Sequence, residues 1–275
     1  MNVIFVKENV LKTDFKPENA VPVTNSYNES ITYDKNGNIM TLLRNGDLDS
    51  DGAFVGAFTI DELTYTYSTT NPNQLVKVDD EAYCSLGFKD YSNPDDDYSY
   101  DANGNMLTDK NKGITSNIKY NHLNLPVTID FGENGNIMYI YNALGQKVRK
   151  DVSQGELHIM TDYLNGFQYE DTRLEFFPTA EGYVKYTRIE SAEHFNYVYN
   201  YTDHLGNIRL SYGLDQDNVL KILEENNYYP FGLKHENYNL GRKEFDKYGI
   251  YPIVELQDCV NCSYKYKYNG KEYQD

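Results

Sequence analysis

The sequence has few of the residues that would mark a disulfide framework, a membrane span or a secretory leader. It contains no tryptophan and only three cysteines, Cys84, Cys259 and Cys262. An odd number of cysteines does not indicate a disulfide framework. No apolar run approaches the roughly 18 residues of a membrane-spanning helix, so we expect no membrane insertion. Residues 1–8 lack the basic start and long apolar stretch of a signal peptide, so none is visible.

Positive charge is also scarce. Lys and Arg number 25 against 42 Asp and Glu, which gives a formal net charge of −17 and a sequence pI of about 4.6. Binding to nucleic acid phosphates requires clustered basic residues. The composition therefore excludes nucleic acid and anionic membrane surfaces as partners, and it fits a solvated acidic exterior.

The motifs of common catalytic sites are missing as well. The sequence has no nucleophile elbow, no phosphate-binding loop and no dinucleotide fingerprint. Four histidines, His122, His158, His194 and His235, are scattered without the spacing of metal ligands. The 42 carboxylates allow a glycosidase-like pair, but nothing in the sequence selects one. We therefore expect no enzyme and no cofactor.

Tyrosine, by contrast, is abundant, with 28 residues beside 12 Phe and 19 Gly. An aromatic ring with a polar tip suits half-buried strand positions. Within residues 120–150, each segment begins at an aromatic residue, crosses a turn containing Asn or Gly, and continues into β-branched or apolar residues. Asn-Gly between two such runs is a strong hairpin signal, because both residues tolerate positive φ. This stretch therefore predicts strand, turn, strand, turn, strand.

The same pattern returns along the chain. Residues 33–40 read YDKNGNIM and residues 100–107 read YDANGNML. Further copies, the first of them looser, begin at Tyr67, Tyr120, Tyr141, Tyr163 and Tyr201. Close copies lie 20–22 residues apart, and the gaps of 33–38 residues indicate insertions. A repeat this short cannot bury its own apolar face, so neighbouring repeats must pair into a continuous sheet. We predict an all-β array of tandem hairpins.

No linker rich in Pro or Ser marks a firm domain boundary. Residues 1–30 form an irregular N-terminal segment, and residues 31–200 carry the repeat array. Residues 201–275 make up the last part, with a polar loop or lid at 234–262. Residues 217–227 fit a short helix and a strand equally well.

Residues 45–61 interrupt the pattern as an acidic, glycine-bearing insertion. Its acids and glycine match positions 1, 3, 5 and 6 of a calcium loop: Asp47, Asp49, Asp51 and Gly52. Position 12 would be Phe58 and not a bidentate Glu, which excludes a true EF-hand. The three aspartates are weak candidates for a looser calcium site, and the alternative is a solvated acidic loop.

Two further pairs of residues invite a chemical interpretation. Asp203 and His204 are adjacent and could form an acid–base pair; in the structural alternative, Asp203 shapes a turn that His204 packs against or caps. Cys259 and Cys262 form a single CxxC without further ligands nearby. They are either an incidental loop pair or a local disulfide.

Together these motifs resemble a known family. The Tyr-Asp-x-Asn-Gly-Asn units resemble the YD repeat of RHS proteins. Three later motifs, in this order, resemble the RHS repeat-associated core of Bacteroidetes-type proteins: YTDHLGNIRL at residues 201–210, NYYPFG at 227–232 and YKYNGKE at 266–272. The resemblance covers roughly residues 31–275. The positions that carry it are Tyr33, Asp34, Gly37, Tyr100, Asp101, Gly104, Asp203, His204, Gly206, Asn207, Arg209, Tyr229, Pro230, Gly232, Asn269 and Gly270.

The resemblance implies a partial RHS- or teneurin-like β-cage, in which a curved sheet of hairpins forms a shell. It implies a secreted or cell-surface protein of the polymorphic toxin class. Its partners would be other RHS repeats of a longer shell, or a C-terminal toxin enclosed by it. The sequence ends before the family's Asp-Pro block, where the toxin is cut free, so self-cleavage and toxicity are not expected of this chain.

A second hypothesis belongs to a different class of function. A tyrosine-rich sheet can also bind sugars by ring stacking, as a carbohydrate-binding or adhesive module at a cell surface. The two hypotheses differ in where the tyrosines point. A shell segment places its aromatic side chains between strands and layers, whereas a glycan-binding module exposes a coplanar cluster of them.

Overall fold

The structure is a computed structural model that describes residues 3–5, 25–50, 53–82, 84–91, 94–189, 192–214, 218–235, 243–246, 249–252 and 264–272. For residues 3–5, 47–50, 53–56, 189, 243–246 and 249–252 it describes the backbone only. The described residues contain strands, turns and three short 3₁₀ turns but no α-helix. No helix in this described part is long and apolar enough to cross a membrane. The predicted all-β class is confirmed.

The strands follow one another as an antiparallel meander, in two main sheets. The first sheet holds five strands: β1 (Val3–Phe5), β2 (Glu29–Tyr33), β3 (Ile39–Ser50), β4 (Ala53–Tyr67) and β5 (Leu75–Asp80). A short hairpin comes next: β6 (Tyr98–Tyr100) and β7 (Met106–Asp109). The second sheet holds eleven strands: β8 (Lys119–Tyr120), β9 (Pro126–Asp130), β10 (Asn136–Tyr141), β11 (Lys147–Gln154), β12 (Leu157–Leu164), β13 (Phe167–Glu170), β14 (Arg173–Thr179), β15 (Gly182–Ile189), β16 (Ala192–Thr202), β17 (Ile208–Leu214) and β18 (Leu220–Glu225).

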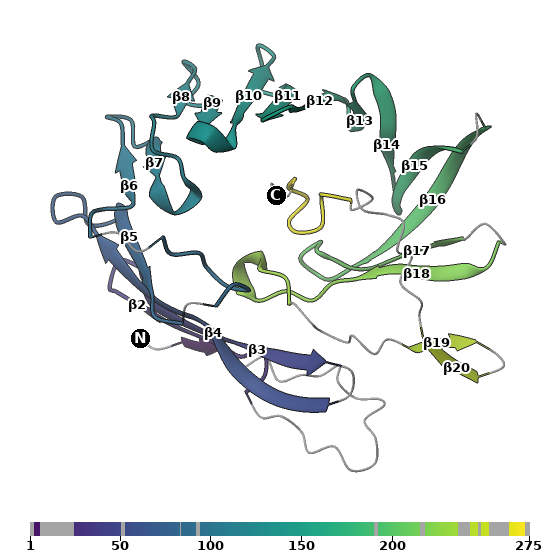
Figure 1. Cartoon of the computed structure of the whole chain (residues 1–275), viewed down its shortest axis with the longest axis horizontal. Helices are drawn as coiled ribbons and strands as arrows, with labels where there is room; N and C mark the ends of the chain where they lie inside the picture. The colour runs from purple at the N-terminus through teal and green to yellow at the C-terminus, as the bar shows by residue number, and fades with distance from the viewer. Residues whose placement is uncertain are drawn as a thin grey trace.

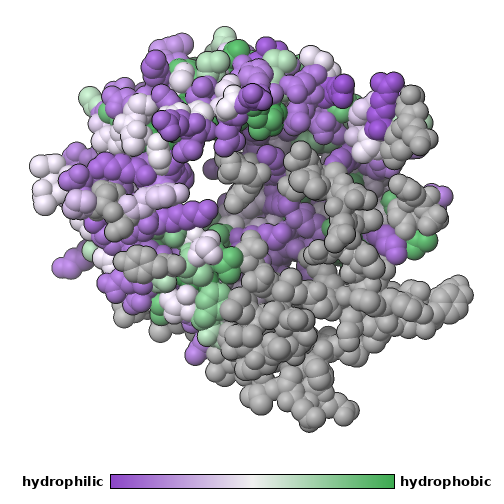
Figure 2. All heavy atoms as spheres, viewed as in Figure 1, coloured by the Kyte–Doolittle hydropathy of each residue, from purple (hydrophilic) through white to green (hydrophobic). Residues whose placement is uncertain are grey.

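The remaining elements are short. The 3₁₀ turns are η1 (Lys110–Lys112), η2 (Gly132–Asn134) and η3 (Pro230–Gly232), and the last hairpin is β19 (Lys243–Asp246) with β20 (Gly249–Pro252). The strands β2 to β18 follow one another around a ring, and the C-terminal segment, residues 264–272, lies inside this ring (Figure 1). Viewed along the same direction, the described side chains are mostly hydrophilic and an opening remains in the ring (Figure 2).

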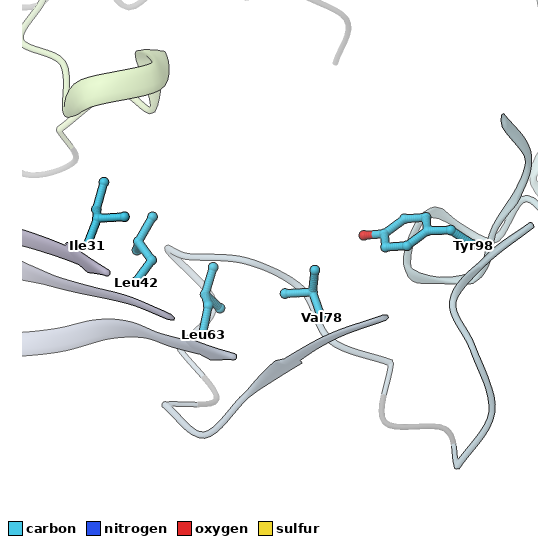
Figure 3. Close-up of a cluster of buried hydrophobic side chains, with 5 residues drawn as sticks. All are labelled: Ile31, Leu42, Leu63, Val78 and Tyr98. Carbon is cyan, nitrogen blue, oxygen red and sulfur yellow. The ribbon is translucent and has the colours of Figure 1, made fainter. Parts of the chain in front are cut away.

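Alternation along the strands decides which side chains form the core. Ile31, Leu42 and Leu63 are directly opposite one another on β2, β3 and β4, and Val78 and Tyr98 extend this row across β5 and β6. All five are buried; the first four point to the same side of the sheet, and Tyr98 points toward them from the hairpin β6–β7 (Figure 3). The neighbouring positions Thr32, Thr41 and Thr64 occupy the other face. Period-two patterning thus separates an apolar inner face from a polar outer face.

Because consecutive strands are antiparallel, every second turn lies at the same end of the sheets. This end, which we call the motif rim, holds the turns at residues 34–38, 68–74, 101–105, 121–125, 142–146 and 203–207. The tyrosine motifs therefore recur every two strands because one repeat is one hairpin. The 11-stranded sheet runs continuously through residue 200, where the sequence suggested a change from repeat array to core segment.

The structure describes strands within three segments that the sequence set apart as irregular or left open. The insertion at residues 45–61 lengthens the hairpin β3–β4, whose strands continue as a paired ladder to Ser50 and Ala53. The predicted loop at 234–262 contains the hairpin β19–β20. The stretch 217–227, left open between helix and strand, contains strand β18. In each case strand pairing satisfies the backbone groups, and this outweighs a polar or acidic composition.

The 38-residue gap between Tyr163 and Tyr201 is an insertion of one whole hairpin. It contains a complete extra hairpin, β14–β15, whose turn carries no tyrosine motif. The copy at Tyr163 differs as well, because its turn has only two residues, Asn165 and Gly166, both with positive φ (50° and 91°). The repeat array is therefore more regular in space than in sequence.

Replacement of Leu63 by alanine tests the inner core. We expect Leu63→Ala to lower the free energy of unfolding by about 2–5 kcal/mol, because it leaves a cavity in the buried row. The adjacent, exposed Thr64 provides the matched control, and Thr64→Ala should cost no more than about 1 kcal/mol. Urea unfolding measures both values, and equal losses would contradict this assignment of faces.

Candidate functional site

Five turns of the motif rim share one hydrogen-bond arrangement. In the turn at 203–207, Asp203 Oδ1 accepts from the backbone N–H groups of Leu205 and Asn207, at 2.9 and 3.0 Å. Asp203 Oδ2 accepts from Asn207 Nδ2 at 3.1 Å. Gly206 has φ of +82°, a left-handed conformation that favours glycine. The turns that begin at the following residues repeat the two backbone bonds: Asp34, Asp101, Asn121 and Asn142.

The hydrogen bonds occupy the carboxylates of these turns. Burial raises the pKa of Asp203, but the bonds from Asn207 and Leu205 outweigh it and hold the pKa below 3.8. Hydrogen bonds likewise lower the pKa of Asp34 and Asp101. The described hydrogen bonds of Asp203 all go to turn residues, and the His204 side chain is exposed. The structure therefore does not assemble the Asp203–His204 acid–base pair.

Five tyrosines, four of them at motif positions, connect a repeat to the one before it. The hydroxyl of Tyr100 donates to the carbonyl oxygen of Leu75 at 2.7 Å, and that of Tyr120 donates to Met106 at 2.6 Å. In every such pair the acceptor is the first residue after the preceding motif-rim turn. The other pairs are Tyr67 with Ile39, Tyr141 with Pro126 and Tyr228 with Ile208. We call this series the tyrosine ladder.

The segment after β18 contacts the first sheet through the side chain of Tyr229. Tyr229 is buried, and its hydroxyl donates to the carbonyl oxygen of Asn45 at 2.6 Å. Its ring lies 5.0 Å from the guanidinium carbon of Arg44. Pro230 begins η3, and Gly232 has φ of +94° with the Tyr268 ring packed against it. Residues 229–232 therefore join strands that are far apart in the sequence.

Beneath Tyr229 lies a buried cluster with one cation and two carboxylates. Arg44 Nε donates to Glu29 Oε2 at 2.7 Å, and Arg44 Nη1 donates to Asp61 Oδ2 at 2.6 Å. Asp61 Oδ1 also accepts from the backbone N–H of Phe88 at 2.5 Å. Glu29 Oε1 is buried without a hydrogen-bond partner among the described residues. Burial therefore outweighs Arg44 and raises the pKa of Glu29 above 4.5.

A second buried cluster anchors the C-terminal segment to the inner face of the 11-stranded sheet. Glu272 Oε2 accepts from Lys147 Nζ at 2.7 Å, and Glu272 Oε1 accepts from Lys150 Nζ at 2.5 Å. The hydroxyl of Tyr163 donates to Glu272 at 2.8 Å. Burial raises the pKa of Glu272, but the two lysines outweigh it and hold the pKa below 4.5. Burial and the Glu272 charge raise the pKa of Tyr163, which therefore stays protonated.

The rest of the segment follows the same inner face. The ring of Tyr264 stacks on that of Tyr183 with centroids 4.2 Å apart. Lys267 forms an ion pair with Glu224. Asn269, one of the positions that carry the family resemblance, donates its backbone N–H to Asn207 Oδ1 at 3.0 Å. Asn269 and Gly270 both have positive φ, 51° and 60°. Arg209 donates to Asn227 and lies over the Tyr228 ring.

The weaker chemical candidates receive no support. Among the described residues, no group of three His, Cys, Asp or Glu could hold a metal ion. Asp47 and Asp49 lie in β3, where only the backbone is described, and Asp51 lies outside the described residues. Cys259 and Cys262 also lie outside them, and Cys84 is a free thiol. The described polar clusters connect segments that lie far apart in the sequence.

Sequence reasoning missed both buried clusters. Lys147 and Lys150 look like ordinary polar strand residues, and the charge of Arg44 gives no sign of burial. Glu272 was the one accessible signal, since it ends the Tyr-Asn-Gly-Lys-Glu motif. Its partners lie more than a hundred positions away in the chain, so only the three-dimensional arrangement brings them together.

No protein-family model and no curated protein matches this sequence. Among solved structures, the chain is similar to TcdB2-TccC3 without its hypervariable C-terminal region, with 18% identity and a TM-score of 0.48 over 76% of this chain and 10% of that one. It is also similar to the Photorhabdus luminescens Tc holotoxin pore, with 14% identity and a TM-score of 0.34 over 75% of this chain and 14% of that one. A third similar structure is TcdB2-TccC3-Cdc42, with 14% identity and a TM-score of 0.35 over 88% of this chain and 17% of that one. The chain thus spans 10–17% of the length of these structures.

Substitutions at Asp203 test the turn. Asp203→Ala removes the acceptor for two backbone N–H groups and should lower the free energy of unfolding by about 1–3 kcal/mol. Asp203→Asn keeps Oδ1 and should retain most of the stability, because Asn121 and Asn142 form the same turn. Chemical denaturation compares the variants. Equal losses for Ala and Asn would show that the oxygen does not shape the turn.

Acid should release the C-terminal segment through Glu272. Its folded pKa lies below 4.5, so the anchor is fully present above that pH and is lost as the pH falls through the lowered pKa. Glu272→Gln should mimic acid at neutral pH, costing about 3–5 kcal/mol, because two lysines lose a buried partner.

Hydrogen exchange of residues 264–272, corrected for intrinsic rates, measures this release. Lys271→Gln is the matched control, since this neighbouring side chain is exposed and should leave the exchange unchanged. A segment equally protected in wild type and Glu272→Gln would contradict the anchor.

Proposed function

We propose that this chain is a non-enzymatic structural segment of an RHS-type shell, secreted or at a cell surface, which encloses or presents a C-terminal effector. The observation that carries this proposal is the tyrosine ladder. Its hydroxyls bind backbone carbonyls of neighbouring repeats, which is where a shell segment needs its aromatic residues. The ordered motifs that resemble the RHS-associated core support the same assignment.

The path of the C-terminal segment indicates the side of the sheet on which an effector would lie. Residues 264–272 lie on the inner face, held by Glu272, Asn269 and stacked tyrosines. Any chain that continues from this segment starts on the concave side of the sheet. Its partners are then other RHS repeats, which extend the wall, and an effector that follows the segment. The fold scaffolds this arrangement and contributes no chemistry of its own.

The glycan-binding alternative receives less support from the described tyrosines. Most of the motif tyrosines use their hydroxyls inside the sheet, and Tyr183, Tyr228 and Tyr229 are buried. An adhesive module would need a coplanar exposed cluster instead. Among the described residues, the exposed Tyr197 and Tyr201 of β16 come nearest to such a cluster.

A protease-accessibility experiment tests the shell proposal. A short flexible peptide with a protease site is attached after Asp275 in the full chain. If the anchored segment directs this extension along the concave side, cleavage should be about tenfold slower than in the Glu272→Ala variant, in which the segment is released.

The control carries the same peptide before Met1, where Glu272→Ala should not change the cleavage rate. Circular dichroism and the melting temperature confirm that both proteins fold. Equal cleavage of the C-terminal site in wild type and Glu272→Ala would contradict an inward path and, with it, the proposed presentation of an effector.

A further inference from the structure

The outer face of strands β13 to β18 is apolar, which the fold does not require. The inner face is identified by the contacts of the C-terminal segment, such as Tyr183 with Tyr264. Strand alternation then places Val184 and Tyr197, which are direct partners, on the opposite face. Phe177 pairs with Val184 on the same side. This face can be followed across the sheet.

The apolar positions form a continuous band. Phe167 stacks on Phe177 with centroids 5.0 Å apart, at the β13 end. On the next strand, Gly213 pairs with Val198, so the following residue, Leu214, lies beside Tyr197. Leu214 in turn pairs with Leu220 of β18. We call this row the outer apolar band: Phe167, Phe177, Val184, Tyr197, Leu214 and Leu220. The strands that carry it form the right-hand side of the ring (Figure 1).

The same fold provides an internal comparison. On the outer face of β2, β3 and β4 the corresponding row is Thr32, Thr41 and Thr64, with the Thr32 and Thr41 hydroxyls hydrogen-bonded at 2.6 Å. A hairpin array of this kind is therefore built equally well with a polar outer face. The band is a property of the second sheet only, so repeat pairing does not account for it.

The side chains around Val184, which is itself only 1% exposed, leave a large apolar surface open on this face of the sheet. Tyr197 is 60% exposed, Leu214 57% and Leu220 60%, and Tyr201 on the same face of β16 is 66% exposed. With Phe167 and Phe195, these side chains expose roughly 600 Å², since a buried aromatic residue accounts for about 200 Å². The largest apolar patch on a typical monomer is about 300–600 Å² and is often functional, so this surface lies at the top of that range. A stable dimer buries about 800 Å² per partner, so the band approaches one half of a standard interface.

We propose that the outer apolar band is a self-association surface that packs against the same band of a second copy of this chain. Two apolar sheet faces can pack about 10 Å apart, as the layers of a β-sandwich do. A surface that meets itself in a twofold interface needs no charge of opposite sign. This suits a band made of aromatic and aliphatic residues. The proposal does not depend on the shell assignment, because it concerns the face that points away from the ring.

Charge gives the association a distinctive salt dependence. Each copy carries a formal net charge of −17, so two copies repel each other. Screening this repulsion should strengthen an apolar interface as NaCl rises from about 0.05 to 0.5 M. An interface held by ion pairs would weaken over the same range.

Two measurements on the full chain test the proposal. Sedimentation velocity over a range of protein concentrations should show a monomer–dimer equilibrium that tightens with salt. Tyr197→Asp and Leu220→Asp, made separately, should each weaken dimerisation about tenfold or more, since they place a charge in the interface. Leu144→Asp is the control, because Leu144 is 83% exposed at the motif rim and lies away from the band. Melting temperatures establish that all variants fold.

Hydroxyl-radical footprinting locates the surface without any substitution. As the protein concentration rises, Tyr197 and Tyr201 should become protected from oxidation. Tyr91, which is 65% exposed in the connection between β5 and β6, should keep its reactivity and serves as the reference.

Three results would overturn the proposal. The protein could remain monomeric at all concentrations and salt levels. Association could persist unchanged in both band variants. Protection of Tyr197 could instead arise only when oligosaccharides are added to monomeric protein, which would make the band a glycan platform.

Discussion

The structure depends on one hydrogen-bond arrangement, an Asp or Asn side-chain oxygen that accepts two backbone N–H groups of its own turn. This oxygen fixes the number of residues between two strands, as in the turn that begins at Asp203. A turn of fixed length fixes the register of the strands, and the register decides which side chains face inward. The pairing of Ile31 with Leu42 in the inner row is thus a consequence of the turn that begins at Asp34.

The tyrosine ladder and the two buried clusters then hold the repeats together over longer distances. Tyr228 continues the ladder beyond the strands of the second sheet, and Tyr229 crosses to the first sheet over Arg44. The two clusters carry an excess of charge of opposite sign: two carboxylates share Arg44, whereas two lysines share Glu272. A buried excess of either sign is costly when a partner is lost. Both clusters therefore favour one arrangement of the ring and penalise partial opening.

The hairpin array could be predicted from sequence because its signals are local. Asn-Gly pairs, alternating apolar residues and a repeat of 20–22 residues all act within one hairpin. The strands could not be predicted where pairing overrides composition, as in the acidic ladder of β3 and β4, or where a hairpin lacks the motif, as in β14–β15. The partners of Glu272 could not be predicted, because they lie more than a hundred positions away in the chain. The outer apolar band could not be predicted either, because the sequence does not show which face of each strand points outward.

The meander also limits how such a chain can change length in evolution. Loss or gain of a single strand would reverse the direction of every later strand, and all subsequent Asx turns would move to the opposite end of the sheet. A hairpin is therefore the smallest insertion or deletion that preserves the tyrosine ladder. The motif-free hairpin β14–β15 has the form of such an insertion. Because it adds two strands, the turn at Asp203 remains at the same end of the sheets as the turn at Asp34.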